Sequence, residues 1–412
     1  MNKTKGYFFG EYEVLFGKYS GPDFSRRCFI FPGQGGAFPG MFKEEYLNFK
    51  IIQDKFAQAD LLAKKFNLPK ISDYVLNPNK IKKEILPAVA NLALFTLELA
   101  IFDILKSLKI YPKIVTGHSF GEYAAIVAAG IVFFEEMFEI VYYRDHFCPS
   151  TNFAGFMIAV NADAKKLKTI LNKEDYYISN LNSPNQTVIS VSKNAVDNIS
   201  KILEEKKIRH KILYNIPQPY HSPYLNDVKK RMEKHFQHKE ISCKAPEIPI
   251  FSSVLNKLID KDNFQKKDIK NIFLNQIITK VDFINQIENI YSLRCFNFLE
   301  IGNKKLFSVF ADDILSSAGK EVKIELASDF LKKNNEAIIG SKNPINSKLF
   351  SLINKAIGKI TGYEIEKISI EDKFQEDLGI DSIKKADILL TVLNEANIRP
   401  GEDFNTSEFV SV

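Results

Sequence analysis

The sequence predicts an α/β protein in which parallel strands alternate with helices. A β-prone run at residues 28–31 leads into a glycine-rich loop, and a second run at 113–116 leads into Gly-His-Ser-Phe-Gly at 117–121. A strand followed by this Gly-x-Ser-x-Gly turn and a helix is the local geometry of a nucleophile elbow. Residues 87–108 are long, strongly apolar and free of proline after their start. This third stretch predicts a buried helix packed on the sheet that carries the elbow.

Length and composition indicate the class of protein. A chain of 412 residues has room for two or three domains, and 45% hydrophobic with 26% charged residues is typical of a soluble globular protein. The net charge of +6 is mild and the lysines are scattered, so no nucleic-acid binding is expected. The four cysteines lie far apart, which favours neither a zinc site nor disulfides and predicts a cytoplasmic protein. No apolar leader or continuous run of about 18 apolar residues is present, so neither secretion nor a membrane span is expected.

Ser119 is the candidate nucleophile at the centre of the elbow. Gly117 and Gly121 suit this geometry because a tight elbow leaves no room for Cβ atoms two residues before and after the nucleophile. The helix-prone run at 123–129 places the serine near free backbone N–H groups, which can stabilise an oxyanion. The pattern alone leaves open an ordinary serine in a glycine-rich turn.

A family resemblance rests on three stretches taken together. Phe-Pro-Gly-Gln-Gly-Gly at 31–36, the helix over 87–108 and Gly-His-Ser-Phe-Gly-Glu at 117–122 resemble malonyl-CoA:acyl carrier protein transacylases. They equally resemble the acyltransferase domains of polyketide and polyunsaturated fatty-acid synthases. The resemblance covers about residues 28–330 and implies a hydrolase-like parallel sheet body. It also implies acyl transfer through a covalent ester on Ser119.

The resemblance implies roles for four further residues. The backbone N–H groups of Gln34 and Phe120 match the family's oxyanion hole. His221 matches the catalytic histidine, which moves a proton between Ser119 and the leaving thiol. Arg144, 25 residues after Ser119, matches the arginine that binds the free carboxylate of malonyl, because a guanidinium fork pairs bidentately with a carboxylate.

Other residues have supporting interpretations. Neighbours on an elbow point apart, so His118 is interpreted as a structural or substrate-contacting residue. The resemblance implies that Gln276 orients the cleft by hydrogen bonding, and that the bulk of Tyr220 favours malonyl over methylmalonyl. His235 and His238 are three residues apart on a charged helix, but without further ligands nearby they indicate a solvated face and no metal site.

A smaller unit is predicted within the acyltransferase region. Residues of about 154–216 follow a β-α-β-β-α-β order, which is that of a ferredoxin-like subdomain. The resemblance implies that this subdomain is inserted into the larger body, with the active site in the cleft between them.

The chain divides into four segments. Residues 1–27 are a lead-in segment without an assigned function, residues 28–330 form the acyltransferase domain, and the polar residues 331–346 form a linker. A second unit follows at 347–412. Charge supports the boundary, because residues 342–412 carry 9 basic and 12 acidic side chains, or −3, which leaves +9 for the rest.

The second unit has a signature of its own. Asp-Leu-Gly-Ile-Asp-Ser-Ile at 377–383 resembles acyl carrier proteins, most closely those of polyketide and polyunsaturated fatty-acid synthases. The resemblance implies covalent 4′-phosphopantetheine on Ser382, and the start of a helix suits a phosphodiester. A plain N-cap serine is the alternative. Because the chain ends thirty residues after Ser382, where the last helix of such bundles normally begins, we expect this small helical domain to be incomplete at its C-terminus.

Together these patterns predict a cytoplasmic acyltransferase that moves a malonyl or related dicarboxylic acyl group from CoA to the phosphopantetheine thiol of an acyl carrier protein, in cis or in trans. The implied partners are the acyl-CoA, the carrier protein, a ketosynthase and a phosphopantetheinyl transferase, with no nucleic acid and no membrane. Two alternatives remain open at this point. One is a serine acyl-hydrolase or esterase, and the other is a catalytically inactive docking scaffold of a synthase.

Overall fold

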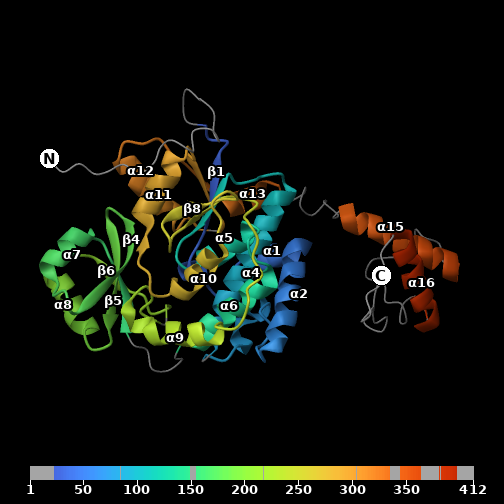
Figure 1. Cartoon of the computed structure of the whole chain (residues 1–412), viewed down its shortest axis with the longest axis horizontal. Coiled ribbons are helices and arrows are strands. Elements are labelled where there is room, and N and C mark those ends of the chain that lie inside the picture. Colours follow the sequence, from blue (N-terminus) through green and yellow to red (C-terminus); the bar gives the residue numbers. More distant parts are fainter. Residues whose placement is uncertain are drawn as a thin grey trace. The chain divides into compact units, whose positions relative to one another are not determined.

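The computed structural model describes residues 23–83, 85–148, 155–216, 218–302, 304–334, 344–362, 380 and 382–396. The chain forms two compact units, Met1–Asn335 and Glu336–Val412. The first unit contains both sheets and the candidate site, and the described part of the second unit contains two helices (Figure 1).

The main sheet has six strands in the order β11-β10-β1-β2-β7-β8. Its strands are β1 (Arg27–Phe31), β2 (Ile114–Gly117), β7 (Ile250–Ser252), β8 (Lys257–Ile259), β10 (Asn297–Glu300) and β11 (Lys323–Leu326). The α/β prediction is confirmed, but the sheet is mixed, because β8 returns antiparallel to β7 as a hairpin. In the parallel pair β1–β2, Phe31 lies opposite Gly117. Both strands therefore end at the same edge, and the loops that follow them meet there.

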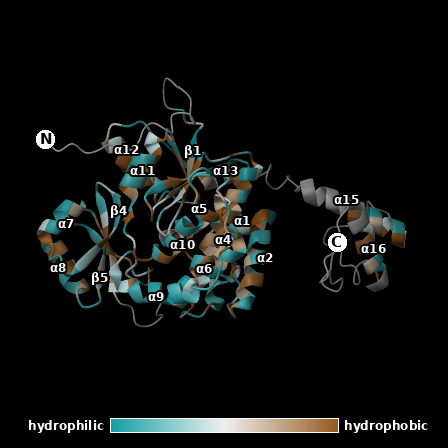
Figure 2. Cartoon of the chain, viewed as in Figure 1, coloured by the Kyte–Doolittle hydropathy of each residue, from teal (hydrophilic) through white to brown (hydrophobic). Residues whose placement is uncertain are grey.

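The first unit also contains helices outside the small subdomain. They are α1 (Lys43–Asn48), α2 (Lys50–Lys65), α3 (Asp73–Leu76), α4 (Leu86–Ser107), α5 (Gly121–Ala128), α6 (Phe134–His146), α9 (Asn226–His235), α10 (Lys266–Asn275), α11 (Phe283–Ser292), α12 (Ser308–Ser317) and α13 (Ala327–Lys333), with short 3₁₀ turns η2 (Gln34–Gly36), η3 (Pro78–Lys80) and η4 (Pro223–Leu225). The hydrophobic colour of α4 contrasts with hydrophilic α9 in Figure 2. By length and composition α4 could cross a membrane, but 83% of its apolar window is buried inside the unit, as in the core helix of a globular protein.

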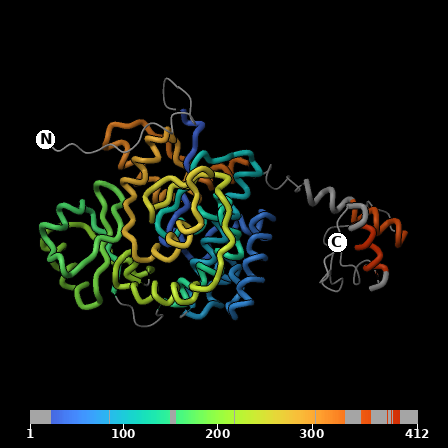
Figure 3. Tube along the Cα trace, viewed as in Figure 1, coloured from blue at the N-terminus to red at the C-terminus, as the bar shows by residue number. Residues whose placement is uncertain are grey.

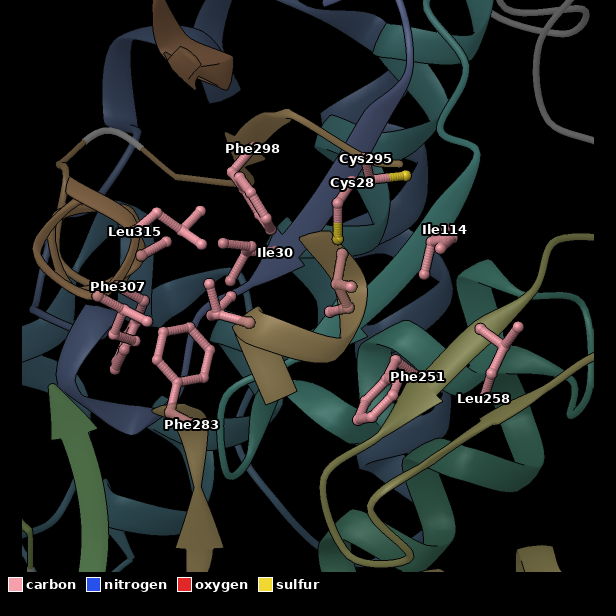
Figure 4. Close-up of a cluster of buried hydrophobic side chains, with 14 of the residues drawn as sticks. Cys28, Ile30, Ile114, Phe251, Leu258, Phe283, Cys295, Phe298, Phe307 and Leu315 are labelled. Carbon is pink, nitrogen blue, oxygen red and sulfur yellow. The ribbon is translucent and has the colours of Figure 1, made fainter. Parts of the chain in front are cut away.

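One part of the core joins the main sheet to the helices α11 and α12 (Figure 4). Cys28 and Ile30 of β1 and Phe298 of β10 contribute side chains from the sheet, and Phe283 and Leu315 contribute side chains from the two helices. Burying these apolar side chains stabilises the arrangement of strands whose ends carry the site.

The small subdomain is one continuous segment, seen as the green lobe in Figure 3. Its elements are β3 (Gly155–Val160), α7 (Ala164–Ile170), β4 (Tyr176–Ser183), β5 (Gln186–Ser192), α8 (Val196–Glu205) and β6 (His210–Ile212). They form a second sheet in the order β6-β3-β5-β4-β9, and the two helices pack on it in a separate core. The strand β9 (Val281–Asp282) comes from the larger body and pairs in parallel with β4. This pairing joins the two parts of the first unit.

The predicted linker differs from the structure at both ends. The helix α13 continues to Lys333, because its residue Leu331 is buried within the first unit. The helix α15 (Pro344–Thr361) begins before residue 347. In the second unit α15 packs on α16 (Ser382–Ala396) through Ala356, Ile357, Ile388 and Val392. The expectation of an incomplete C-terminus concerns residues 397–412, which lie outside the described residues.

Candidate active site

Ser119 lies on a strained elbow between β2 and α5. Its φ angle is +55°, a left-handed conformation that non-glycine residues seldom adopt. A Cβ atom at Gly117 would lie 2.1 Å from the backbone nitrogen of Glu122, and one at Gly121 would lie 2.0 Å from the carbonyl oxygen of Phe31. Both contacts are impossible for a side chain, so the two glycines are required for this turn.

The imidazole of His221 faces Ser119. The Ser119 Oγ atom lies 2.6 Å from Nε2 of His221, and Nδ1 of the same ring lies 2.8 Å from the carbonyl oxygen of Thr279. A carbonyl oxygen can only accept, so Nδ1 carries the proton and Nε2 accepts from the serine hydroxyl. Burial lowers the pKa of His221 to about 3, which keeps the ring neutral. The pair therefore has the geometry and the protonation state for removing the proton of the hydroxyl.

A backbone carbonyl takes the third position of this array. In the part of the chain that the structure describes, no carboxylate is hydrogen-bonded to His221. The segment between α10 and β9 makes a second hydrogen bond to His221, because the backbone N–H of His221 donates to the carbonyl oxygen of Ile277 at 2.7 Å. The carbonyl of Thr279 fixes the tautomer and ring orientation, as a carboxylate does in a Ser-His-Asp triad.

The loop after β1 packs directly on the elbow. A Cβ atom at Gly33 would lie 2.8 Å from the carbonyl oxygen of His118. The next residue, Gln34, begins the turn η2, and Phe120 directly precedes α5. Neither the Gln34 N–H nor the Phe120 N–H has an acceptor among the described residues. Both donors are thus free to bind an oxyanion beside Ser119.

Arg144 of α6 is buried behind the serine and histidine. Its exposed fraction is 0%. The guanidinium carbon lies 4.4 Å from the ring centre of Tyr220 and 5.2 Å from that of Phe120. Because Phe120 follows Ser119 and Tyr220 precedes His221, both members of the pair have a neighbour in contact with this cation. Its Nη1 donates to Asp145 Oδ1 at 2.5 Å, whereas its buried Nε has no partner among the described residues.

His118 and Gln276 border the site. His118 Nε2 lies 2.8 Å from Asn182 Oδ1 in the small subdomain, and its ring stacks on Phe307 with centroids 4.2 Å apart. Burial lowers the pKa of His118 to about 4, so this neutral ring links the two parts of the unit. The hydroxyl of Tyr123 donates to Gln276 Oε1 at 3.3 Å, and the buried Nε2 of Gln276 has no partner in the described structure.

Sequence reasoning missed three groups that hold these side chains. Thr279 acts through a carbonyl, which every residue type carries, so no sequence signal exists. Asn182 is 64 residues from the histidine that it contacts. Asp145 follows Arg144 in the sequence, but consecutive side chains on a helix point in different directions. The sequence therefore does not predict that Asp145 pairs with the guanidinium.

Two further predicted positions belong to other elements of the chain. The helix α16 begins at Ser382 in the second unit, and its side chain lies outside the described residues. His235 is exposed, and its ring centroid lies 3.8 Å from that of Tyr143. Among the described residues, no group of three or more His, Cys, Asp or Glu side chains could hold a metal ion.

A serine on a strained elbow, facing a neutral histidine and two free N–H groups, characterises enzymes that transfer acyl groups through a serine ester. The chain belongs to the acyl transferase domain family, which matches residues 28–292. It is therefore an acyltransferase, and the resemblance to this family is confirmed.

Curated relatives include free-standing enzymes and synthases. The chain is 28% identical to the malonyl CoA-acyl carrier protein transacylase of Bacillus subtilis over 326 residues, which is 76% of this chain and 99% of that protein. It is also 28% identical over 233 residues, 56% of this chain, to the conidial yellow pigment biosynthesis polyketide synthase of Emericella nidulans. A polyunsaturated fatty acid synthase polypeptide from Thraustochytrium is 24% identical over 77% of this chain. The chain spans only 11% of each of these two synthases.

Solved structures share the fold. An acyl carrier protein S-malonyltransferase from Vibrio cholerae has a TM-score of 0.62 at 23% identity, over 73% of this chain and 96% of that one. The acyltransferase domain of SpnD has a TM-score of 0.65 at 20% identity, over 74% of this chain and 71% of that one.

Proposed function

We propose that this chain transfers a malonyl or related dicarboxylic acyl group from CoA to the phosphopantetheine thiol of an acyl carrier protein. The observation that carries the proposal is the buried Arg144 behind the contact between Ser119 and His221. An unpaired Nε donor on a buried guanidinium favours an acyl group that ends in a carboxylate. Relatives and structural neighbours named as malonyl transferases support the same substrate.

The reaction proceeds in two halves. Ser119 Oγ attacks the thioester carbonyl while His221 Nε2 takes its proton, and the N–H groups of Gln34 and Phe120 bind the oxyanion. The C–S bond then breaks, and the proton on His221 passes to the sulfur of CoA. In the second half His221 removes the proton of the carrier thiol, which attacks the seryl ester and restores the Ser119 hydroxyl.

Two structural assignments belong to this proposal. The small subdomain is ferredoxin-like, supported by its β-α-β-β-α-β order and its antiparallel strand order β6-β3-β5-β4. The second unit is a carrier domain with 4′-phosphopantetheine on Ser382, supported by the start of α16 at this residue and its packing on α15. Incubation with CoA and a phosphopantetheinyl transferase should modify the peptide that contains Ser382, and Ser382→Ala should abolish the modification.

Intact-mass spectrometry after incubation with malonyl-CoA tests the main proposal. One malonyl group should appear, map to Ser119 and disappear when a carrier protein with a free phosphopantetheine thiol is added. Release of free malonate faster than transfer to that thiol would instead indicate an acyl-hydrolase. Absence of any acyl-enzyme from protein with native circular dichroism would indicate a scaffold, with Ser119→Ala as the matched control.

A further inference from the structure

Arg144 is already paired within the pocket proposed to bind the acyl group. Its Nη1 donates to Asp145 Oδ1 at 2.5 Å, and the side-chain exposures of this pair are 1% and 6%. Asn91 of α4 donates from Nδ2 to the other carboxylate oxygen of Asp145 at 2.7 Å. The bond to Asn91 holds the Asp145 carboxylate in place. Each of the two carboxylate oxygens therefore accepts a hydrogen bond from a different side chain.

This pairing leaves one edge of the guanidinium open. Within the described part of the chain, the buried Nε has no hydrogen-bond partner and no bond from Nη2 is found. Nε and Nη2 form one side of the planar fork, which is an edge that can donate two parallel bonds to a carboxylate. Asp145 therefore orients Arg144 so that this edge faces away from Asp145.

The charge of the pocket follows from the same contacts. Among the described residues, the ionisable groups that act on the pair include Tyr123, Cys148 and Tyr220, and burial raises the pKa of each. Nearby His221 is neutral as well, because burial lowers its pKa. At rest, Arg144 and Asp145 thus supply one cation and one anion to this contact. A bound acyl carboxylate would place two anions around one cation in a buried site, which is unfavourable at low dielectric.

We propose that Asp145 is a positioning residue that also sets acyl specificity: a carboxylated acyl group binds together with a proton on Asp145, whereas an uncharged acyl group binds without one. This inference rests on the proposed function, because it takes the pocket of Arg144 as the acyl site. Burial already raises the pKa of Asp145 against the lowering effect of Arg144, and a second carboxylate nearby would raise it further. Preference for malonyl over acetyl should therefore fall as pH rises.

The experiment measures kcat/KM for malonyl-CoA and acetyl-CoA between pH 6 and pH 9, read as the seryl ester on Ser119. Dividing one value by the other cancels any titration that affects both substrates alike, and the malonyl carboxylate stays ionised over this range. In the wild-type chain the ratio should fall by up to about tenfold per pH unit. A ratio that is constant with pH would overturn the proposal, and this measurement requires no variant.

Asp145→Asn supplies the matched test. The amide keeps the size and an acceptor for Arg144, and Asn91 can rotate its own amide to face the new N–H₂ group. We expect a ratio that no longer depends on pH and that exceeds the wild-type ratio about tenfold or more at pH 8. A purely structural role would lower both kcat/KM values without changing their ratio, which would overturn the proposal. Asp197→Asn on the exposed face of α8 controls for loss of a surface charge.

The proposed function can fail separately. If the wild-type chain forms an acetyl ester but no malonyl ester at any pH, malonyl transfer is wrong for this protein. Asp145→Asn then decides the inference alone, since a gain of malonyl ester supports it and no gain overturns it. If malonyl transfer proceeds normally while the ratio ignores both pH and Asp145→Asn, only the inference fails.

Discussion

A Cβ atom at Gly121 would lie 2.0 Å from the carbonyl oxygen of Phe31, so the start of α5 lies in direct backbone contact with the end of β1. This approach brings the loop with Gln34 beside Ser119. Because both partners are backbone, neither can rotate away from an added methyl group, and the strand and the helix would have to separate.

Gly121→Ala should therefore destabilise the first unit by about 3 kcal/mol or more, since overpacking against a rigid backbone is costly. Urea unfolding followed by circular dichroism measures the change. Gly35→Ala is the matched control, because a Cβ atom there would meet nothing within 4 Å. Equal midpoints for the two variants would contradict the steric argument.

His221→Ala should slow both halves of the reaction by about 10² to 10⁴, the usual contribution of a general base. Quenched-flow sampling with intact-mass spectrometry gives the rates of ester formation and of discharge to a carrier thiol. Ser119→Ala should form no ester at all. Normal rates in His221→Ala would mean that another group accepts the proton.

Ester formation should not follow the titration of an ordinary histidine. Burial lowers the pKa of His221 to about 3, and the neutral ring is the active base, so activity is lost only as pH falls toward that value. Acetyl-CoA avoids the dependence proposed for Asp145, so its kcat/KM should stay level from about pH 8 down to about pH 5. A tenfold loss per unit below pH 6.5 would show that the folded-state pKa is close to that of free histidine.

Arg144→Ala should lower malonyl transfer about 30-fold to 1000-fold relative to acetyl transfer, because a charge-assisted bidentate pair contributes about 2 to 4 kcal/mol in a buried site. Arg144→Lys keeps the charge but loses the fork, so it should recover only part of the preference. Competition between the two acyl-CoAs, read by mass spectrometry of the ester, gives the ratio directly. An unchanged ratio in Arg144→Ala would exclude the carboxylate role.

Glu98→Gln should make the first unit more stable than wild type, by an amount that grows as pH rises. Glu98 is 1% exposed, neither of its carboxylate oxygens has a partner among the described residues, and burial with nearby Glu300 raises its pKa well above normal. The folded chain keeps the proton that the unfolded chain releases above about pH 4.5, so native stability falls by up to about 1.4 kcal/mol per pH unit until the folded pKa is reached.

Urea unfolding of Glu98→Gln and wild type should therefore differ little at pH 4.5, and the variant should be more stable by about 2 to 3 kcal/mol at pH 7. The exposed Glu44→Gln on α1 serves as the control and should show no such trend. A pH-independent difference would mean that Glu98 is ionised in the folded protein.

The sequence alone determined the α/β class, the elbow at Ser119, the buried helix over 87–108 and the β-α-β-β-α-β order of about 154–216, because these depend on neighbouring residues. Glycines at 117 and 121 report a local steric need, and apolar periodicity reports a buried helix. Residues 31–36 and 117–122 also identified the family, so that Arg144 and His221 could be proposed as site residues.

Only the tertiary structure decided what holds those residues. The acceptor of the His221 Nδ1 proton is a carbonyl oxygen at Thr279, which carries no residue signature. Asp145 meets Asn91 across 54 residues, and β9 joins a sheet whose other strands belong to the small subdomain. Such contacts depend on how separate elements pack, and local sequence constrains that packing only weakly.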